Sequence, residues 1–229
     1  MYFDSTYLIV LPAIIFAMIA QFMVKSTFSK YSTVRNQHGY TAAEVARRIL
    51  DDNGLNYIPI EHVNGELTDH YDPTSNVIRL SDSVYNSTSV AAIGVAAHEV
   101  GHAIQHAEGY APIKVRQAII PITQIGSKLA LPLILIGMLI SVFDFLIPVG
   151  IFLYAGVVLF QAVTLPVEFN ASGRALKTLD EDLILYKDEV RMAKSVLSAA
   201  AMTYVAAMFS SLMTLLRLIL IASGGRRRR

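Results

Sequence analysis

Long apolar stretches without charged side chains constrain this chain more than any other feature of its sequence. Residues 7–24 carry no charge, and residues 129–143 and 145–167 are separated only by Asp144. A helix needs about 20 apolar residues to cross a bilayer, so these stretches predict one span followed by a hairpin of two spans. The chain is 54% hydrophobic and 16% charged, an excess of apolar surface that a soluble domain of this length cannot bury. We therefore expect a mainly α, integral membrane protein.

The first apolar stretch is interpreted as an uncleaved anchor. The residues before it include Asp4 but no Lys or Arg, and no small-residue cleavage site follows it, as a signal peptide would require. Basic residues beside membrane spans favour the cytosolic side. Those that flank the first and second spans place residues 25–128 and 168–194 in the cytosol: Lys25, Lys30, Arg35, Lys114, Arg116 and Lys128.

The fourth apolar stretch, residues 195–222, conflicts with this orientation. It contains Arg217 and precedes the arginine tail at 226–229, which should bind anionic headgroups on the cytosolic side. Either this stretch is re-entrant or packed sideways on the protein, or the tail is an exception to the charge rule. We prefer a helix that does not fully cross, and so expect three to four membrane-embedded helices.

The segment between the first span and the hairpin has the mixed pattern of a folded domain. Thr41 and Glu44 form a capping-box pair ahead of a short helix, and residues 57–63 and 76–81 have the pattern of strands. A long apolar helix is predicted over residues 90–107. The expected organisation is an anchor, a cytosolic metalloprotease region with a small β-sheet, a transmembrane hairpin, a second cytosolic segment and a membrane-associated C-terminal helix, over residues 1–28, 29–127, 128–167, 168–194 and 195–229.

The helix predicted over residues 90–107 contains the sequence His98-Glu99-Val100-Gly101-His102. Two His four residues apart project from one helix face, where both imidazoles can bind one ion. Glu99 lies beside that face and can act as a general base without binding the metal. This HExxH arrangement predicts two Zn²⁺ ligands and a catalytic carboxylate. The competing interpretation is a pair of His that simply pack in a helix interface.

A third ligand must come from elsewhere in the chain. His106 continues the spacing, but it lies about 9 Å along the helix axis from the midpoint of the two other His. An imidazole can bind a metal only about 6 Å from its own Cα. Glu168 is the best candidate, because a carboxylate beside hydrocarbon is costly unless it is paired or bound to metal. It could also simply mark the end of the third span; weaker candidates, which a turn also explains, are Asp69, His70 and Asp72.

Three segments carry a resemblance to a known family. The runs at residues 67–73, 89–106 and 167–169 resemble the YugP-type bacterial membrane zinc metallopeptidases, and the likeness covers essentially the whole chain. More distantly, residues 168–172 are similar to the Glu-(Phe/Tyr)-x-Ala-Asp segment of HtpX-type and CAAX-prenyl membrane proteases. The resemblance implies a zincin-like catalytic helix in a bacterial cell membrane, with Glu168 as the third Zn²⁺ ligand. Ser172 stands where those relatives carry Asp, which leaves Asn170 or Ser172 to contact a ligating His.

These features suggest a mechanism. Zn²⁺ held by His98, His102 and Glu168 would lower the pKa of a bound water toward about 7, and Glu99 would take its proton and return it to the leaving amine. An extended substrate could pair with the edge of the strand predicted at 76–81. The candidates for stabilising the oxyanion, each also an ordinary surface or turn residue, are Arg174, His62, His70 and Tyr71.

The predicted function is a zinc-dependent endopeptidase acting on membrane or membrane-associated proteins at the cytosolic face. A zinc-binding scaffold with little proteolytic activity is the main alternative, although it would not need Glu99. A hydrolase of lipids or small amides would use the same residues, and a transporter would need more polar spans. Small residues in the spans are compatible with intramolecular packing, with a homo-oligomer or with a membrane-protein partner. The formal net charge of +1 gives no case for nucleic acid.

Overall fold

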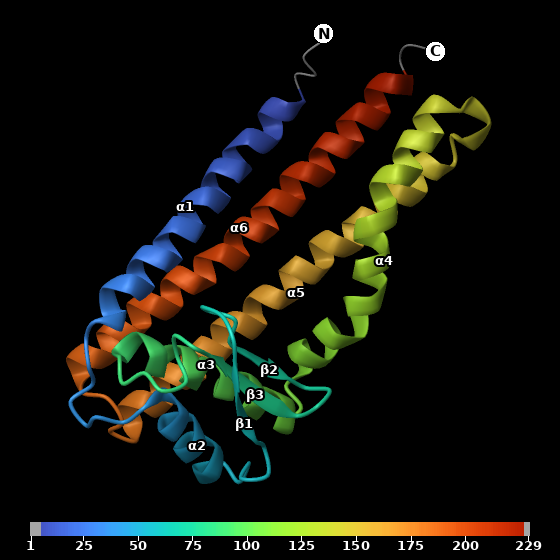
Figure 1. Cartoon of the computed structure of the whole chain (residues 1–229). Helices are drawn as coiled ribbons and strands as arrows, with labels where there is room; N and C mark the ends of the chain where they lie inside the picture. Colours follow the sequence, from blue (N-terminus) through green and yellow to red (C-terminus); the bar gives the residue numbers. More distant parts are fainter. Residues whose placement is uncertain (1–5, 227–229) are drawn as a thin grey trace. The chain divides into compact units, whose positions relative to one another are not determined.

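The computed structural model describes residues 6–226, which fold as two compact units (Figure 1). Unit 1 takes in the chain up to Gln21, then Lys114–Leu165 and the chain from Thr203, and unit 2 takes in Phe22–Ile113 and Pro166–Met202. The elements in chain order are α1 (Tyr7–Ser32), α2 (Ala42–Asp52), β1 (Ile60–Val63), β2 (His70–Asp72), β3 (Val77–Ser81), α3 (Val90–Ala107), α4 (Ala111–Leu139), η1 (Ser141–Phe143), α5 (Leu146–Glu181) and α6 (Lys187–Arg226).

Four of the described helices, α1, α4, α5 and α6, are long and apolar enough to cross a membrane. This confirms a mainly α membrane protein. The predicted hairpin is present, with η1 between α4 and α5. Both helices extend beyond the predicted spans, since α4 begins at Ala111 and α5 continues to Glu181. Within unit 1 a Cβ on Gly150 would lie 2.6 Å from the carbonyl oxygen of Ala130, so this glycine serves intramolecular helix packing.

The last apolar stretch lies within α6, one of the four described helices that are long and apolar enough to cross a membrane, whereas a helix that does not fully cross was preferred. Helix α6 has no break of the kind that a re-entrant segment needs, and within unit 1 it lies alongside α1 rather than sideways. Phe16 packs edge-on against Phe209, and the Arg217 guanidinium lies 3.8 Å from the centre of the Tyr7 ring. Arg217, the charged residue within this stretch, is accommodated by an aromatic face at the start of α1. The predictions for Asp4 and for residues 227–229 of the tail concern residues outside the part of the chain that the structure describes.

Unit 2 contains a small sheet whose strand order is β1-β3-β2. β3 pairs in parallel with β1 and antiparallel with β2, with Ile78 opposite both Ile60 and Tyr71. Two of these strands were predicted, whereas β2 was interpreted as a turn. The expectation that the strand at 76–81 offers a free edge is also wrong, because β3 is the central strand. The edge strand that lies next to α3 (Val90–Ala107) is β2.

Helices α2 and α3 form the core of unit 2 together with this sheet. Thr41 and Glu44 make the predicted capping box, and Ser89 caps α3 by accepting a hydrogen bond from the backbone N–H of Ala92. Most of α3 is buried, because its apolar residues face the core on nearly all sides. The second part of α5, from Pro166 onward, belongs to the same unit. Unit 2 therefore holds α3 and the Glu168 turn of α5 in one folded body.

Candidate metal centre

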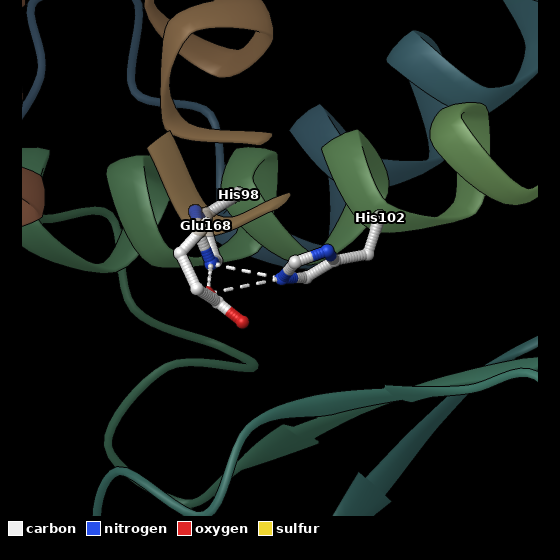
Figure 2. Close-up of side chains that lie close together, drawn as sticks. All are labelled: His98, His102 and Glu168. Carbon is white, nitrogen blue, oxygen red and sulfur yellow. Dashed lines mark hydrogen bonds and ion pairs between the residues drawn. The ribbon is translucent and has the colours of Figure 1, made fainter. Parts of the chain in front are cut away.

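The three predicted metal ligands come together in unit 2. Helix α3 presents His98 and His102 from one face, and α5 brings Glu168 toward them; Figure 2 shows the three side chains pointing at one another. The Nε2 atoms of the two imidazoles are 3.1 Å apart. The Oε2 atom of Glu168 lies 3.3 Å from Nε2 of His98 and 3.4 Å from Nε2 of His102. The three donor atoms thus form a small triangle with nearly equal sides.

The size of this triangle fits a zinc ion. Zinc binds nitrogen and oxygen ligands at about 2.0–2.1 Å in tetrahedral sites, which places neighbouring donor atoms about 3.3 Å apart. The distances of 3.1, 3.3 and 3.4 Å agree with that spacing. Two imidazoles and one carboxylate are also a ligand set that catalytic zinc sites use, with one position left for water. The residues present therefore fit Zn²⁺ by donor type, number and spacing.

Burial makes this cluster costly without a positive charge at its centre. Only 2% of the surface of Glu168 is exposed, and His102 is 9% exposed. Removing a carboxylate from water costs several kcal/mol unless an opposite charge compensates. Burial lowers the pKa of His102, but its hydrogen bond to Glu168 and the carboxylate charges of Glu99 and Glu168 together raise that pKa above its usual value. The surroundings of the His102 imidazole thus favour a positive charge.

Each imidazole has a polar contact on the side away from the triangle. The Oγ of Ser172 lies 3.1 Å from Nδ1 of His98, and Oε1 of Gln105 lies 3.0 Å from Nδ1 of His102. Asn170 acts one step further out, since its Oδ1 accepts a hydrogen bond from the Gln105 amide. Of the two residues proposed in place of the relatives' Asp, Ser172 contacts a ligating His and Asn170 contacts Gln105 instead. Sequence reasoning missed Gln105, although its place three residues after His102 on an apolar helix was a signal.

Glu99 is held beside the triangle by the edge strand. Its Oε2 accepts a hydrogen bond from the backbone N–H of Tyr71 at 2.9 Å, and the residue is 9% exposed. The Tyr71 hydroxyl donates to Oδ1 of Asn76 and lies 3.0 Å from Nδ1 of His106. Burial raises the pKa of Tyr71 to about 12, so this hydroxyl stays protonated at neutral pH. Through Tyr71, strand β2 contacts α3 both at Glu99 and at the end of the helix.

The remaining sequence candidates have other contacts. His106 is not part of the donor triangle, as the helix geometry predicted, and contacts Tyr71 instead. Among the four oxyanion candidates only Tyr71 contacts Glu99. Of the others, Arg174 pairs with Glu108 and donates to Asn170, His62 pairs with Asp82, and the His70 ring contacts the carbonyl of Thr68.

The two acidic residues weighed as alternative metal ligands stabilise the sheet. Asp69 accepts hydrogen bonds from the backbone and hydroxyl of Ser81, and burial raises the pKa of Asp69. Asp72 accepts hydrogen bonds from the Ser75 hydroxyl and the Thr74 N–H and pairs with Arg79 at 3.0 Å, and these contacts hold its pKa well below the usual range. Neither carboxylate belongs to the donor triangle. Contacts within the sheet and in the turn after β2 thus explain them without a metal.

Comparisons with known proteins agree with this geometry. A family model described as "Putative neutral zinc metallopeptidase" matches residues 6–223. A relative from Bacillus subtilis (strain 168), described as "Putative membrane protease YugP", is 51% identical over 207 residues, which cover 90% of this chain and 92% of that protein. No solved structure matches the chain.

Proposed function

Because this chain belongs to the neutral zinc metallopeptidase family, we propose that it is a membrane-embedded endopeptidase that hydrolyses peptide bonds of membrane or membrane-associated proteins. The observation that carries the proposal is the donor triangle of His98, His102 and Glu168, whose spacing of 3.1–3.4 Å suits zinc. Four helices long and apolar enough to cross a membrane support a membrane-associated substrate. The protease name of the Bacillus relative supports peptide hydrolysis.

In the proposed mechanism the three ligands and Glu99 have separate roles. His98, His102 and Glu168 would hold Zn²⁺, which when bound supplies a Lewis acid and lowers the pKa of water. Glu99 would accept the proton of the attacking water and deliver it to the leaving amine. Its carboxylate is kept beside the site by the Tyr71 N–H at 2.9 Å. This contact orients the base without neutralising it, because a backbone N–H donates a hydrogen bond but carries no full charge.

The edge strand offers a way to align an extended substrate. β2 is the outer strand of the sheet, and the Tyr71 N–H points away from β3 toward Glu99. Peptide segments often bind by adding a strand to such an edge. We propose that substrate lies along β2, which replaces the earlier expectation for β3. The peptide would then pass beside Glu99.

A scaffold that binds zinc without hydrolysing peptides is the second candidate. It would keep the donor triangle but would have no use for a buried carboxylate that is not a ligand. Glu99 is such a carboxylate, and burying it costs free energy that the hydrogen bond from the Tyr71 N–H offsets only in part. This favours an enzyme over a scaffold.

We further propose that the site faces the cytosol, with the turn between α4 and α5 outside. The chain has no Cys, so single cysteines can report on each side. Val142, in the turn, is 79% exposed, and Glu66, in the loop before β2, is also exposed. A membrane-impermeant maleimide applied to intact cells should label Val142→Cys, and should label Glu66→Cys only after the cells are permeabilised. The reverse pattern would place the site outside.

The metal site is tested by the zinc content of the detergent-purified protein. We expect about one zinc per chain in the wild type and a sharp loss in both His102→Ala and Glu168→Ala, because each removes one of three donors. His70→Ala is the matched control, since the His70 side chain is exposed and, in the described structure, hydrogen-bonds the Thr68 carbonyl rather than a residue of the triangle; it should keep its zinc. Zinc retained in Glu168→Ala would remove the third ligand from the proposal. No zinc in the wild type after reconstitution would leave the peptidase without its main support.

A further inference from the structure

Gln105 is a buried amide that joins the two helices of the donor triangle. Its side chain has no exposed surface. On α3 its Oε1 lies 3.0 Å from Nδ1 of His102. On α5 its Nε2 donates to the carbonyl of Val167 at 2.8 Å and to Oδ1 of Asn170 at 2.9 Å. The two α5 contacts flank Glu168 in sequence, so one amide holds both an imidazole and the turn that carries the carboxylate.

The direction of every hydrogen bond in this group follows from Arg174. A guanidinium only donates, and Nε of Arg174 lies 2.8 Å from the Asn170 side chain, so the Asn170 atom there must be the oxygen. That same oxygen contacts Gln105, which must therefore present its NH₂ group. The Val167 carbonyl also requires the NH₂ group of Gln105 on this side, because a carbonyl oxygen can only accept a hydrogen bond.

The consequence reaches the metal-facing nitrogen of His102. With the NH₂ of Gln105 directed at α5, its oxygen faces His102, and Nδ1 of that imidazole has to donate. A neutral imidazole protonated at Nδ1 has its lone pair on Nε2, the atom that lies 3.4 Å from Glu168. The tautomer of His98 is not fixed in this way, because the hydroxyl of Ser172 can either donate to Nδ1 or accept from it.

We propose that Gln105 and Asn170, with Arg174 fixing their orientation, are positioning residues for the metal centre. They select the tautomer of His102 that can bind a metal through Nε2, and they hold the Glu168 turn against α3. The inference rests on the proposed function, since it assigns roles around a zinc ion. It goes beyond that function because it assigns the control of ligand geometry to two uncharged amides, those of Gln105 and Asn170. They act on His102, whereas Ser172 contacts His98.

Three variants separate this role from simple packing. Gln105→Leu removes the acceptor for His102 while filling similar space, and Asn170→Leu removes the oxygen that orients Gln105. Asn170→Asp keeps an oxygen that accepts from both Gln105 and Arg174. If the residues only pack the helices, Asn170→Leu and Asn170→Asp should have the same zinc affinity, although only Asp can accept the hydrogen bonds.

The measurements are zinc affinity, by competition with a chromophoric chelator, and ¹⁵N–¹H spectra of histidine-labelled protein in detergent. We expect Gln105→Leu and Asn170→Leu to bind zinc about 10–100-fold more weakly, as is usual when a partner of a ligating His is lost. Asn170→Asp should stay close to the wild type. The spectra should show His102, assigned by its absence in His102→Ala, protonated at Nδ1 in the wild type and in Asn170→Asp.

Each outcome decides the matter. Equal affinities in Asn170→Leu and Asn170→Asp, or a His102 signal that is protonated at Nε2 but not at Nδ1 in the wild type, would overturn the positioning role while leaving the zinc site intact. A wild type that binds no zinc would overturn the proposed function and this inference together. Should Gln105→Leu fail to fold, the comparison of the two Asn170 variants, which alter a partly exposed position, still decides.

Discussion

Replacing Glu99 with Gln is expected to abolish peptide hydrolysis while leaving zinc bound. Glu99 is not among the three donors, so the substitution removes no metal ligand. A Gln side chain keeps the oxygen that accepts the Tyr71 N–H at 2.9 Å, so β2 and α3 should stay joined. What is lost is a group that can accept a proton. General-base catalysis contributes about 10²–10⁴-fold to the rate, and a loss of that size is expected.

The measurement compares cleavage of fluorescently labelled casein by wild type, Glu99→Gln and the matched control Glu66→Gln. Glu66 is an exposed loop residue, so its replacement should leave both zinc content and rate unchanged. If Glu99→Gln retained most of the wild-type rate with its zinc in place, Glu99 would not be the base. If the wild type bound zinc but cleaved neither casein nor a peptide library, the zinc scaffold would become the better description.

The membrane helices could be predicted because their signal is local. Length and the absence of charge identified three spans from residues 7–24, 129–143 and 145–167. Helix α1 contains the first stretch, whereas α4 ends at Leu139 within the second and α5 begins at Leu146 within the third. The fourth helix was harder to predict, because its charged residue, Arg217, contacts Tyr7 from the other end of the chain. Strand order failed for the same reason. Nothing in the local pattern says that β3 pairs on both sides, because register is set by contacts distant in sequence.

The residues of the candidate site also divide into those that local sequence predicts and those that depend on contacts distant in sequence. His98 and His102 follow from helical periodicity alone, and the cost of a carboxylate beside hydrocarbon, together with the resemblance, pointed to Glu168. Gln105 could not be assigned from sequence, because its role depends on Val167 and Asn170 on another helix. A polar residue in the apolar stripe of α3 shows only that a partner must exist, not where that partner lies.

Replacing Gly101 with Ala should weaken zinc binding, although it touches no ligand. A Cβ at this position would lie 2.7 Å from the carbonyl oxygen of Ala171 and 3.3 Å from its Cα, so backbone of α5 would have to move. Ala171 is three residues after Glu168, in the same stretch of helix, and a shift there carries the carboxylate away from the two imidazoles. We expect zinc affinity to fall at least as much as it does when the hydrogen-bond partner of a metal ligand is removed, which is about 10–100-fold.

Zinc affinity decides this prediction better than stability does. Overpacking costs about 1–3 kcal/mol, but Ala gains about 0.8–1 kcal/mol over Gly in a helix, so the melting temperature of Gly101→Ala should fall only modestly. Gly173→Ala is the matched control on α5, because a Cβ there meets nothing within 4 Å. It should keep its zinc and melt at the same or a higher temperature. Unchanged zinc affinity in Gly101→Ala would mean that the Glu168 turn tolerates displacement, and that close approach of α3 and α5 does not set the geometry of the metal centre.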